Sequence, residues 1–359
     1  MATPRPAPPQ EPFTAAAQLI SNTAEDGHAR IAFTAHGDGA PAIWSPAFGS
    51  PRPMAMQADG PKRWRLETTL PADACASWAA VPDMQAALPS IGDRLRALVS
   101  TRARVDLGTR MDARFIVNNA TAPSLYRLVG ADPQHQLTPN IGLIPTPNAT
   151  APDTDSLCAP APQGTQYRVG RHRLVTRGDY HNEALLLDGE VLRRWDDDLA
   201  ETGWSRSYLD NRSAPQRLRD HSRPMKFAQQ MAPLLRDIAC SPHIIIGTSA
   251  TAPTALALAI QLKSPQVVLL SPAFPNELTR QYLATEAAGR GIRLDVRAGC
   301  QENGAGDPRR AILDHARAFC TQVRQAGGDA TFREFSGGHD LPAWHFAQLH
   351  ALREAAAQL

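Results

Sequence analysis

From residue 183 onward, short apolar runs alternate with stretches of helical period, and this alternation limits the possible folds more than any other feature of the chain. The apolar runs lie at 183–187, 243–246, 267–270, 293–297 and 330–335, and the helical stretches lie at 224–237, 253–262 and about 309–326. Short apolar strands between helices are typical of a mostly parallel sheet that is covered on both faces. The sequence therefore predicts an α/β fold for this part of the chain.

The first part of the chain has a different pattern. Apolar and polar residues alternate at 29–34 and 63–69, between turns rich in Gly, Pro and Asp, and this predicts the strands of a small antiparallel sandwich. A chain of 359 residues also exceeds the size at which one core keeps growing. We expect a flexible, Pro-rich tail at 1–26, the first strand near Ala29, the sandwich at 27–144, a polar linker at 145–164 and the α/β domain at 165–359.

Composition excludes several classes of function. The formal charge of +2 is too small to suggest nucleic acid as a partner. The five cysteines are widely spaced and form no CxxC pair, so neither a disulfide framework nor a zinc site is indicated, and a reducing compartment fits best. The N-terminus lacks the pattern of a signal peptide, and no run approaches the roughly 18 apolar residues of a membrane span. We expect a cytoplasmic protein with no metal, no cofactor and no membrane partner.

The segment HIIIGTSATAPTALALAIQL, at 243–262, carries the strongest chemical signal. An apolar strand ends at Gly247, a sharp turn presents Ser249, and an Ala-rich helix follows at once. This order is typical of a nucleophile elbow, in which the N–H of the next residue, here Ala250, faces the oxyanion that forms. The usual pattern is G-x-S-x-G, and Thr251 occupies the place of the second glycine, where a side chain is expected to crowd the helix against the strand. The alternative is that Ser249 only caps the helix.

A second segment, FREFSGGHDLPAWHF at 332–346, supports the elbow interpretation. It places His339 on a loop after the last strand, where hydrolases with this elbow carry their general base. Gly337 and Gly338 would let the loop bend back over the elbow. We expect Asp340, adjacent to the base, to be structural and Trp344 to pack beside the base loop.

Together these motifs resemble the enterochelin esterases, which act on ferric catecholate trilactones and belong to the esterase D-like α/β-hydrolases. GGHDLPAW resembles the GGHD-x-x-x-W signature of that family. Four further segments match in the same order: LVGADPQHQLTPN at 128–140, LLLDGEV at 185–191, YLDNRSAPQRLRD at 208–220 and RAGCQEN at 297–303. The resemblance implies an α/β-hydrolase domain preceded by an immunoglobulin-like β-sandwich domain.

The same resemblance assigns roles to single residues. Ser249 is the expected nucleophile and His339 the expected general base. Glu302 stands at the family's AG-x-x-E position and is favoured as the acid, but the loop after it is long, and Asp307 in that loop is a rival.

The remaining assignments concern the substrate. Gly189, after the strand LLLD, is the expected second oxyanion donor beside Ala250. Arg212 and Arg217 lie where the family places an arginine facing its substrate, with Arg217 the closer match, although surface solubility explains both equally well. The histidines show no metal-binding spacing.

The resemblance implies a serine esterase that hydrolyses a catecholate trilactone siderophore or a related polyester through an acyl-enzyme. Its partner would be a small-molecule ester, iron–siderophore complexes included. Two other functions remain open. Thr251 and the long loop after Glu302 suggest a remodelled pocket, which fits an acyltransferase or thioesterase-like enzyme of secondary-metabolite biosynthesis. If Thr251 distorts the elbow, the chain is instead a catalytically impaired binding module.

Overall fold

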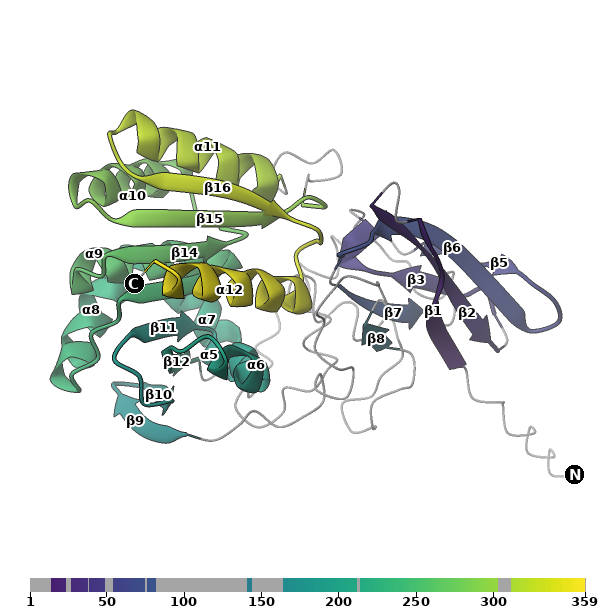
Figure 1. Cartoon of the computed structure of the whole chain (residues 1–359), viewed down its shortest axis with the longest axis horizontal. Helices are drawn as coiled ribbons and strands as arrows, with labels where there is room; N and C mark the ends of the chain where they lie inside the picture. The colour runs from purple at the N-terminus through teal and green to yellow at the C-terminus, as the bar shows by residue number, and fades with distance from the viewer. Residues whose placement is uncertain are drawn as a thin grey trace, which may run out of the picture.

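The computed structural model describes residues 14–23, 27–37, 39–48, 54–74, 76–81, 141–143, 164–211, 214–302 and 311–358 (Figure 1). Its largest unit is an eight-stranded sheet in the order β16-β15-β14-β13-β11-β12-β10-β9. Neighbouring strands are parallel from β16 to β12, and β10 and β9 are added antiparallel at the edge. The strands are β9 (Thr165–Val169), β10 (His172–Arg177), β11 (Glu183–Leu187), β12 (Ser205–Asp210), β13 (Ile244–Thr248), β14 (Gln266–Leu270), β15 (Arg293–Gly299) and β16 (Ala330–Phe335).

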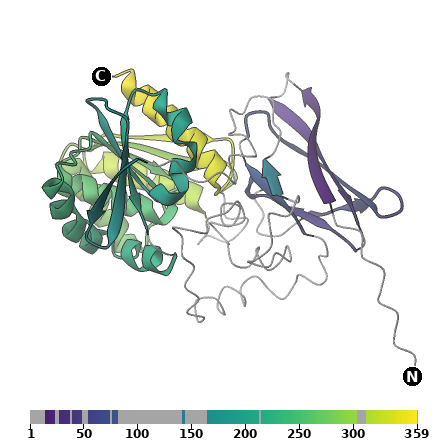
Figure 2. The ribbon, with the colours of Figure 1, turned by 90° about the horizontal axis from the view of Figure 1, so that it is seen from below.

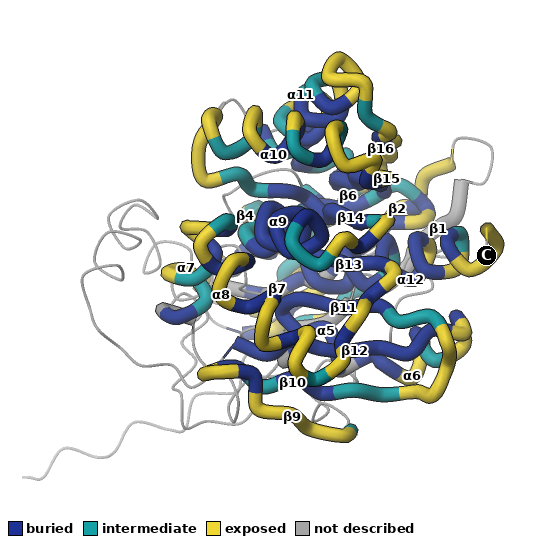
Figure 3. The backbone as a smooth tube through the Cα atoms, turned by 90° about the vertical axis from the view of Figure 1, so that its left-hand side faces the viewer, coloured by how far each residue is buried: buried dark blue, intermediate teal, exposed yellow. Residues whose placement is uncertain are grey.

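Helices cover both faces of this sheet. The α-helices are α5 (Gly189–Leu192), α6 (Asp196–Ala200), α7 (Ala214–His221), α8 (Pro224–Asp237), α9 (Ala252–Leu262), α10 (Glu277–Gly289), α11 (Ile312–Gln325) and α12 (Leu341–Ala356). Two short 3-10 turns are η3 (Arg193–Trp195) and η4 (Ser249–Thr251). One core packs α8 to α11 on the sheet and a second packs α5, α6 and α12 on the opposite face. The central strands β11, β13, β14 and β15 are therefore buried except at the first residue of β11, β14 and β15 (Figure 3).

The N-terminal strands form two four-stranded antiparallel sheets. One has the order β1-β2-β6-β5 and the other β4-β3-β7-β8. The elements are β1 (Thr14–Thr23), β2 (His28–His36), β3 (Ala42–Trp44), η1 (Pro46–Phe48), β4 (Met54–Ala55), β5 (Gln57–Ala58), β6 (Arg63–Pro71), β7 (Ser77–Val81) and β8 (Ile141–Leu143). Residues of both sheets share one core, with Phe33 against Trp78 at its centre. This unit is a small β-sandwich, separate from the large sheet (Figure 2).

The predicted fold class is confirmed, and one expectation about the N-terminus is wrong. The first strand is β1, which begins at Thr14 inside the segment expected to be a flexible tail. Its Ala-rich sequence reads locally as a weak helix, but residues along its whole length pair with β2. Pairing with a neighbouring strand overrides local propensity here. In addition, β9, β10, β12 and α10 were not predicted.

The strand β12 shows why a buried strand can escape an apolar pattern. All of its residues are buried, yet its sequence is SRSYLD. The Arg206 guanidinium pairs with Asp196, and the Ser207 hydroxyl donates to Glu183. Because these polar groups find partners inside the protein, burial costs little and leaves no hydrophobic signal.

Candidate active site

The turn at Ser249 has the backbone strain expected of a nucleophile elbow. Ser249 has φ 51°, in the left-handed region that side chains other than glycine rarely adopt. A Cβ at Gly247 would lie 2.7 Å from both Ala255 Cβ and the Thr251 carbonyl oxygen, so the strand and helix approach too closely for any side chain there. The Ser249 carbonyl accepts a hydrogen bond from Ala273 N at 3.0 Å, which ties the turn to the segment after β14. The turn is therefore fixed by close packing of strand and helix at Gly247 and by the hydrogen bond from Ala273.

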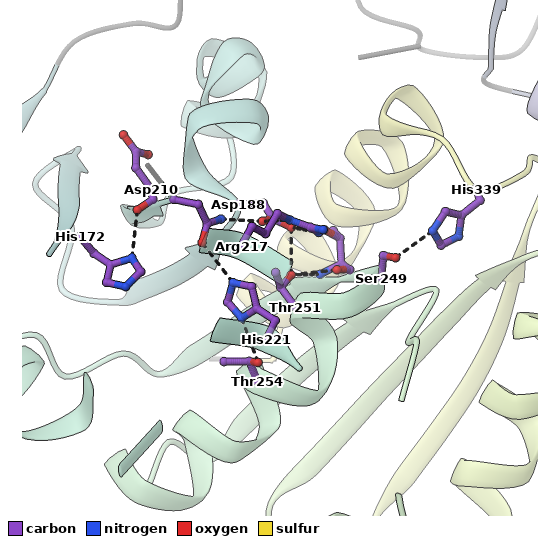
Figure 4. A network of polar contacts seen from close by, with 11 residues as sticks. His172, Asp188, Asp210, Arg217, His221, Ser249, Thr251, Thr254 and His339 are labelled. Atoms are coloured by element: carbon purple, nitrogen blue, oxygen red, sulfur yellow. Dashed lines mark hydrogen bonds and ion pairs between the residues drawn. The ribbon is translucent and has the colours of Figure 1, made fainter. Parts of the chain in front are cut away.

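Ser249, His339 and Glu302 lie in hydrogen-bonding contact although they are far apart in sequence. His339 Nε2 is 2.8 Å from Ser249 Oγ, and its Nδ1 is 2.5 Å from Glu302 Oε1 (Figure 4 shows the first contact). An ionised carboxylate only accepts hydrogen bonds, so Nδ1 carries the proton and Nε2 accepts from the serine hydroxyl. The His339 side chain is 18% exposed and that of Glu302 only 2%, which leaves the imidazole reachable and the carboxylate shielded. Such an arrangement is able to activate a hydroxyl.

The Glu302 carboxylate is fixed by contacts on its second oxygen. Oε2 accepts hydrogen bonds from the Ser271 hydroxyl at 2.8 Å and from Gly299 N at 2.7 Å. Gly299 also lies so close to Gly337 that a side chain there would collide with its carbonyl. The loops that carry Glu302 and His339 are therefore packed directly on each other, which sets the distance between the two side chains.

Residues at the start of α12 orient the imidazole. The Trp344 ring packs edge-on against His339 with centroids 4.6 Å apart, and its Nε1 donates to Ser271 Oγ at 2.8 Å. Asp340 is buried at the N-cap of α12 and accepts from Leu341 N at 2.9 Å. Trp344 thus packs beside the base loop and Asp340 is a capping residue, as expected.

Thr251 does not crowd the elbow as the sequence suggested. Its side chain is fully buried, and Thr248, not Ser249, is the N-cap of η4. Thr251 Oγ1 accepts from Thr248 N at 2.9 Å, and its single proton is shared between Thr248 O at 2.8 Å and Asp188 Oδ2 at 3.1 Å. The hydroxyl thus lies between Thr248, at the end of β13, and Asp188 (Figure 4). The alternative in which Ser249 is a helix cap is therefore wrong.

Asp188 lies at the end of β11 and collects donors from several elements. Arg217 pairs with it in a bidentate manner, with Nε and Nη2 each 2.6 Å from a carboxylate oxygen. Asn211 Nδ2 donates at 2.8 Å and Thr248 Oγ1 at 3.1 Å. Burial alone raises the pKa of Asp188, but the charge and hydrogen bonds of Arg217 outweigh it and hold the pKa below its usual range. The carboxylate is therefore ionised although fully buried.

A directed chain of hydrogen bonds leads away from this carboxylate. Because Asn211 Nδ2 donates to Asp188, its Oδ1 accepts from His221 Nε2 at 3.1 Å. His221 Nδ1 then accepts from the Thr254 hydroxyl at 3.0 Å. Burial lowers the pKa of His221 to about 3, so this imidazole is neutral. His221 supports the back of the elbow from α7 and does not reach Ser249 (Figure 4).

Gly189 begins α5 directly after Asp188, at the same edge of the sheet as Ser249. Leu186 of β11 pairs with Ile246 of β13 in parallel, and Gly189 and Ser249 lie three positions further on, just after the carboxyl ends of these neighbouring strands. A Cβ at Gly189 would lie 2.6 Å from Tyr208 Cβ and 2.7 Å from Asp210 Oδ1. Only glycine fits this position.

The other residues named from the sequence have different outcomes. Asp307 and Arg212 lie outside the described residues. Arg217 is brought to the site, where its guanidinium contacts Asp188. Sequence reasoning missed Ser271 and Asp188, although both directly follow apolar strands of a parallel sheet, and strand ends are where such sheets place functional groups.

The described elements define an α/β-hydrolase fold with a Ser–His–Glu arrangement at the carboxyl edge of its sheet. The solved ferric enterobactin esterase of Salmonella typhimurium is similar over 94% of this chain and 95% of its own, with a TM-score of 0.62 and 17% sequence identity. The enterobactin esterase of Shigella flexneri, solved in the presence of enterobactin, aligns over 96% of both chains with a TM-score of 0.59 and 18% identity. The chain thus has the fold of the ferric enterobactin esterases, as its motifs indicated. By sequence it matches no protein-family description and no curated protein.

Proposed function

We propose that this protein is a serine esterase in which Ser249 is the nucleophile, His339 the general base and Glu302 the acid. The observation that carries the proposal is the continuous hydrogen-bonded path from Ser249 Oγ through His339 to Glu302, starting at a strained strand-to-helix turn. Nucleophile, base and orienting carboxylate in this order are the requirements of acyl-transfer chemistry. The Thr251 hydroxyl makes hydrogen bonds within the elbow and to Asp188, which supports a working elbow over an impaired binding module.

The reaction follows from the positions of the protons. As Ser249 Oγ bonds to the ester carbonyl carbon, its proton passes to His339 Nε2 and the carbonyl electron pair moves to oxygen. Glu302 stabilises the imidazolium, and the backbone N–H groups of Ala250 and Gly189 receive the oxyanion. The C–O bond then breaks, and the leaving alcohol takes the proton from Nε2. Water repeats the sequence on the acyl-enzyme and restores Ser249.

For the substrate, we extend the proposal to the ester bonds of a catecholate siderophore. The solved structures of the same fold are ferric enterobactin esterases, and one was solved in the presence of enterobactin. Their likeness spans nearly the whole chain, including the sandwich, which supports a substrate site of the same general kind. The described part of the chain contains no helix long and apolar enough to cross a membrane. The described cysteines Cys240, Cys300 and Cys320 are free thiols, which supports the proposed cytoplasmic location.

The test compares the parent with Ser249→Ala on enterobactin, ferric enterobactin and an activated acyl ester. Ser222→Ala is the control, because Ser222 is exposed and its hydroxyl donates only to the nearby Arg219 O among the described contacts. We expect Ser249→Ala to lose about 10⁴-fold or more in kcat and to lose labelling by a fluorophosphonate. Full activity in Ser249→Ala would overturn the mechanism. If the parent hydrolyses the activated ester but neither form of enterobactin, the proposed siderophore substrate is wrong. If an added amine is converted to an amide, the reaction is acyl transfer and not hydrolysis.

A further inference from the structure

The two proposed oxyanion donors belong to different loops, and a single buried carboxylate connects them. Gly189 follows Asp188, and Ala250 precedes Thr251. Asp188 Oδ2 lies 3.1 Å from Thr251 Oγ1 and 3.1 Å from Thr248 Oγ1, so both ends of the elbow meet the residue next to Gly189. Figure 4 shows the contact between Asp188 and Thr251 on the side of Ser249 away from His339.

Asp188 combines backbone strain, burial and a full set of hydrogen bonds. Asp188 has φ 60°, a strained conformation for a residue with a side chain, and is 1% exposed. Strain of this kind persists only where the surroundings hold it. Here Arg217 and Asn211 supply three further hydrogen bonds, at 2.6, 2.6 and 2.8 Å. The Asp188 carboxylate is thus fixed by Arg217 and Asn211, and it accepts hydrogen bonds from the elbow residues Thr248 and Thr251.

Resting on the proposed function, we infer that Thr251 and Asp188 are positioning residues that clasp the elbow to the end of β11 and so fix the spacing of the Ala250 and Gly189 amides. In this clasp Arg217 acts on the oxyanion donors through Asp188. Thr251 therefore replaces the second elbow glycine with a hydrogen-bonding role of its own. Because an oxyanion requires both donors within hydrogen-bond distance at once, the clasp affects the transition state more than the bound substrate.

The most informative variant is Thr251→Val, which keeps the shape of the side chain and removes only its hydroxyl. Thr251→Ser restores the hydroxyl on a smaller side chain. Thr202→Val is the matched control, because Thr202 is also buried and its hydroxyl donates to Leu199 O at 2.6 Å, away from the elbow. Variants of Arg217 are less suitable because they leave a buried carboxylate uncompensated.

The first readout is kinetic, with an activated ester as substrate and a boronic acid as tetrahedral mimic. We expect Thr251→Val to lower kcat by about tenfold or more and to weaken boronic-acid binding in parallel, with KM changed by less than about twofold. Thr251→Ser should recover most of kcat. Thr202→Val should keep kcat even where its melting temperature falls as much as that of Thr251→Val. Equal kcat in Thr251→Val and Thr202→Val would overturn the inference.

The second readout does not depend on catalysis. Amide hydrogen exchange, followed by mass spectrometry, should become faster in Thr251→Val at both 185–192 and 247–252, and at neither segment in Thr202→Val. Faster exchange confined to 247–252 would show that the clasp does not couple the two loops. If the parent hydrolyses no ester, the proposed function fails, while the exchange measurement still decides whether the two loops are coupled.

Discussion

The hydroxyl of Ser271 donates a hydrogen bond to Glu302 Oε2 at 2.8 Å and accepts one from Trp344 Nε1 at the same distance. Ser271 has φ 49° and is fully buried directly after β14. It therefore connects the acid loop to the helix that supports the base. Its position beside Glu302 leaves only one carboxylate oxygen for His339.

We expect Ser271→Ala to lower kcat by about tenfold, because Glu302 loses one of the contacts that hold its orientation. The orphaned indole N–H of Trp344 should also cost about 1–3 kcal/mol of stability. Steady-state kinetics and thermal melting measure both effects. Unchanged kcat together with a lower melting temperature would limit Ser271 to a structural role.

A second prediction separates the two acids named from the sequence. Glu302→Gln should lower kcat by about 10²–10⁴-fold, because an amide can donate to Nδ1 and stabilise the wrong imidazole tautomer. Asp307→Asn should leave kcat within about twofold of the parent. Initial rates of both variants on an activated ester show which carboxylate is the acid. The reverse order of effects would assign the acid to Asp307.

Gly189→Ala should move the backbone that carries a proposed oxyanion donor. The new Cβ would meet Tyr208 Cβ at 2.6 Å and Asp210 Oδ1 at 2.7 Å. We expect kcat to fall by about 10²-fold. Gly289→Ala is the control, since nothing lies within 4 Å of its Cβ and it ends α10. That substitution should stabilise the protein by about 0.5–1 kcal/mol without changing kcat. Parent-like rates in Gly189→Ala would argue against Gly189 as a donor.

The buried His221 predicts a dependence of stability on pH. Burial lowers its pKa to about 3, against 6.5 for an ordinary histidine, so between these values the unfolded chain binds a proton that the folded protein does not. This contribution to stability is complete above pH 6.5 and falls as the pH decreases toward 3, by up to about 1.4 kcal/mol per pH unit.

The measurement compares melting temperatures of the parent and His221→Gln. The variant loses hydrogen bonds to Asn211 and Thr254 and should melt lower than the parent at pH 7.5. The difference should shrink between pH 6.5 and 4.5, because only the parent loses the contribution of His221. His28→Gln, at an exposed position of β2, should show no such trend. A constant difference across this range would contradict the low pKa.

The sequence alone predicted the α/β class, the elbow at Ser249, the base at His339 and Glu302 as the favoured acid, and the structure brings these three side chains into contact. Each follows from a local pattern: an apolar strand before a turn, a glycine pair before a histidine, or a short family motif. These local patterns predict a common site because the carboxyl ends of strands in a parallel sheet meet at one edge. They did not reveal β12, whose polar residues are paired inside the protein, or β1, whose conformation depends on its pairing with β2.

The effect of Thr251 and the partner of Arg217 were decided only by the tertiary structure. In the sequence, Thr251 is a departure from the glycine pattern, and Arg217 is one arginine among many. In the folded protein both contact Asp188, a residue more than 25 positions away from either in the sequence. Whether a side chain crowds a turn or is held by it depends on where neighbouring side chains point. That direction is fixed by packing between strands and helices, which no local stretch of sequence contains.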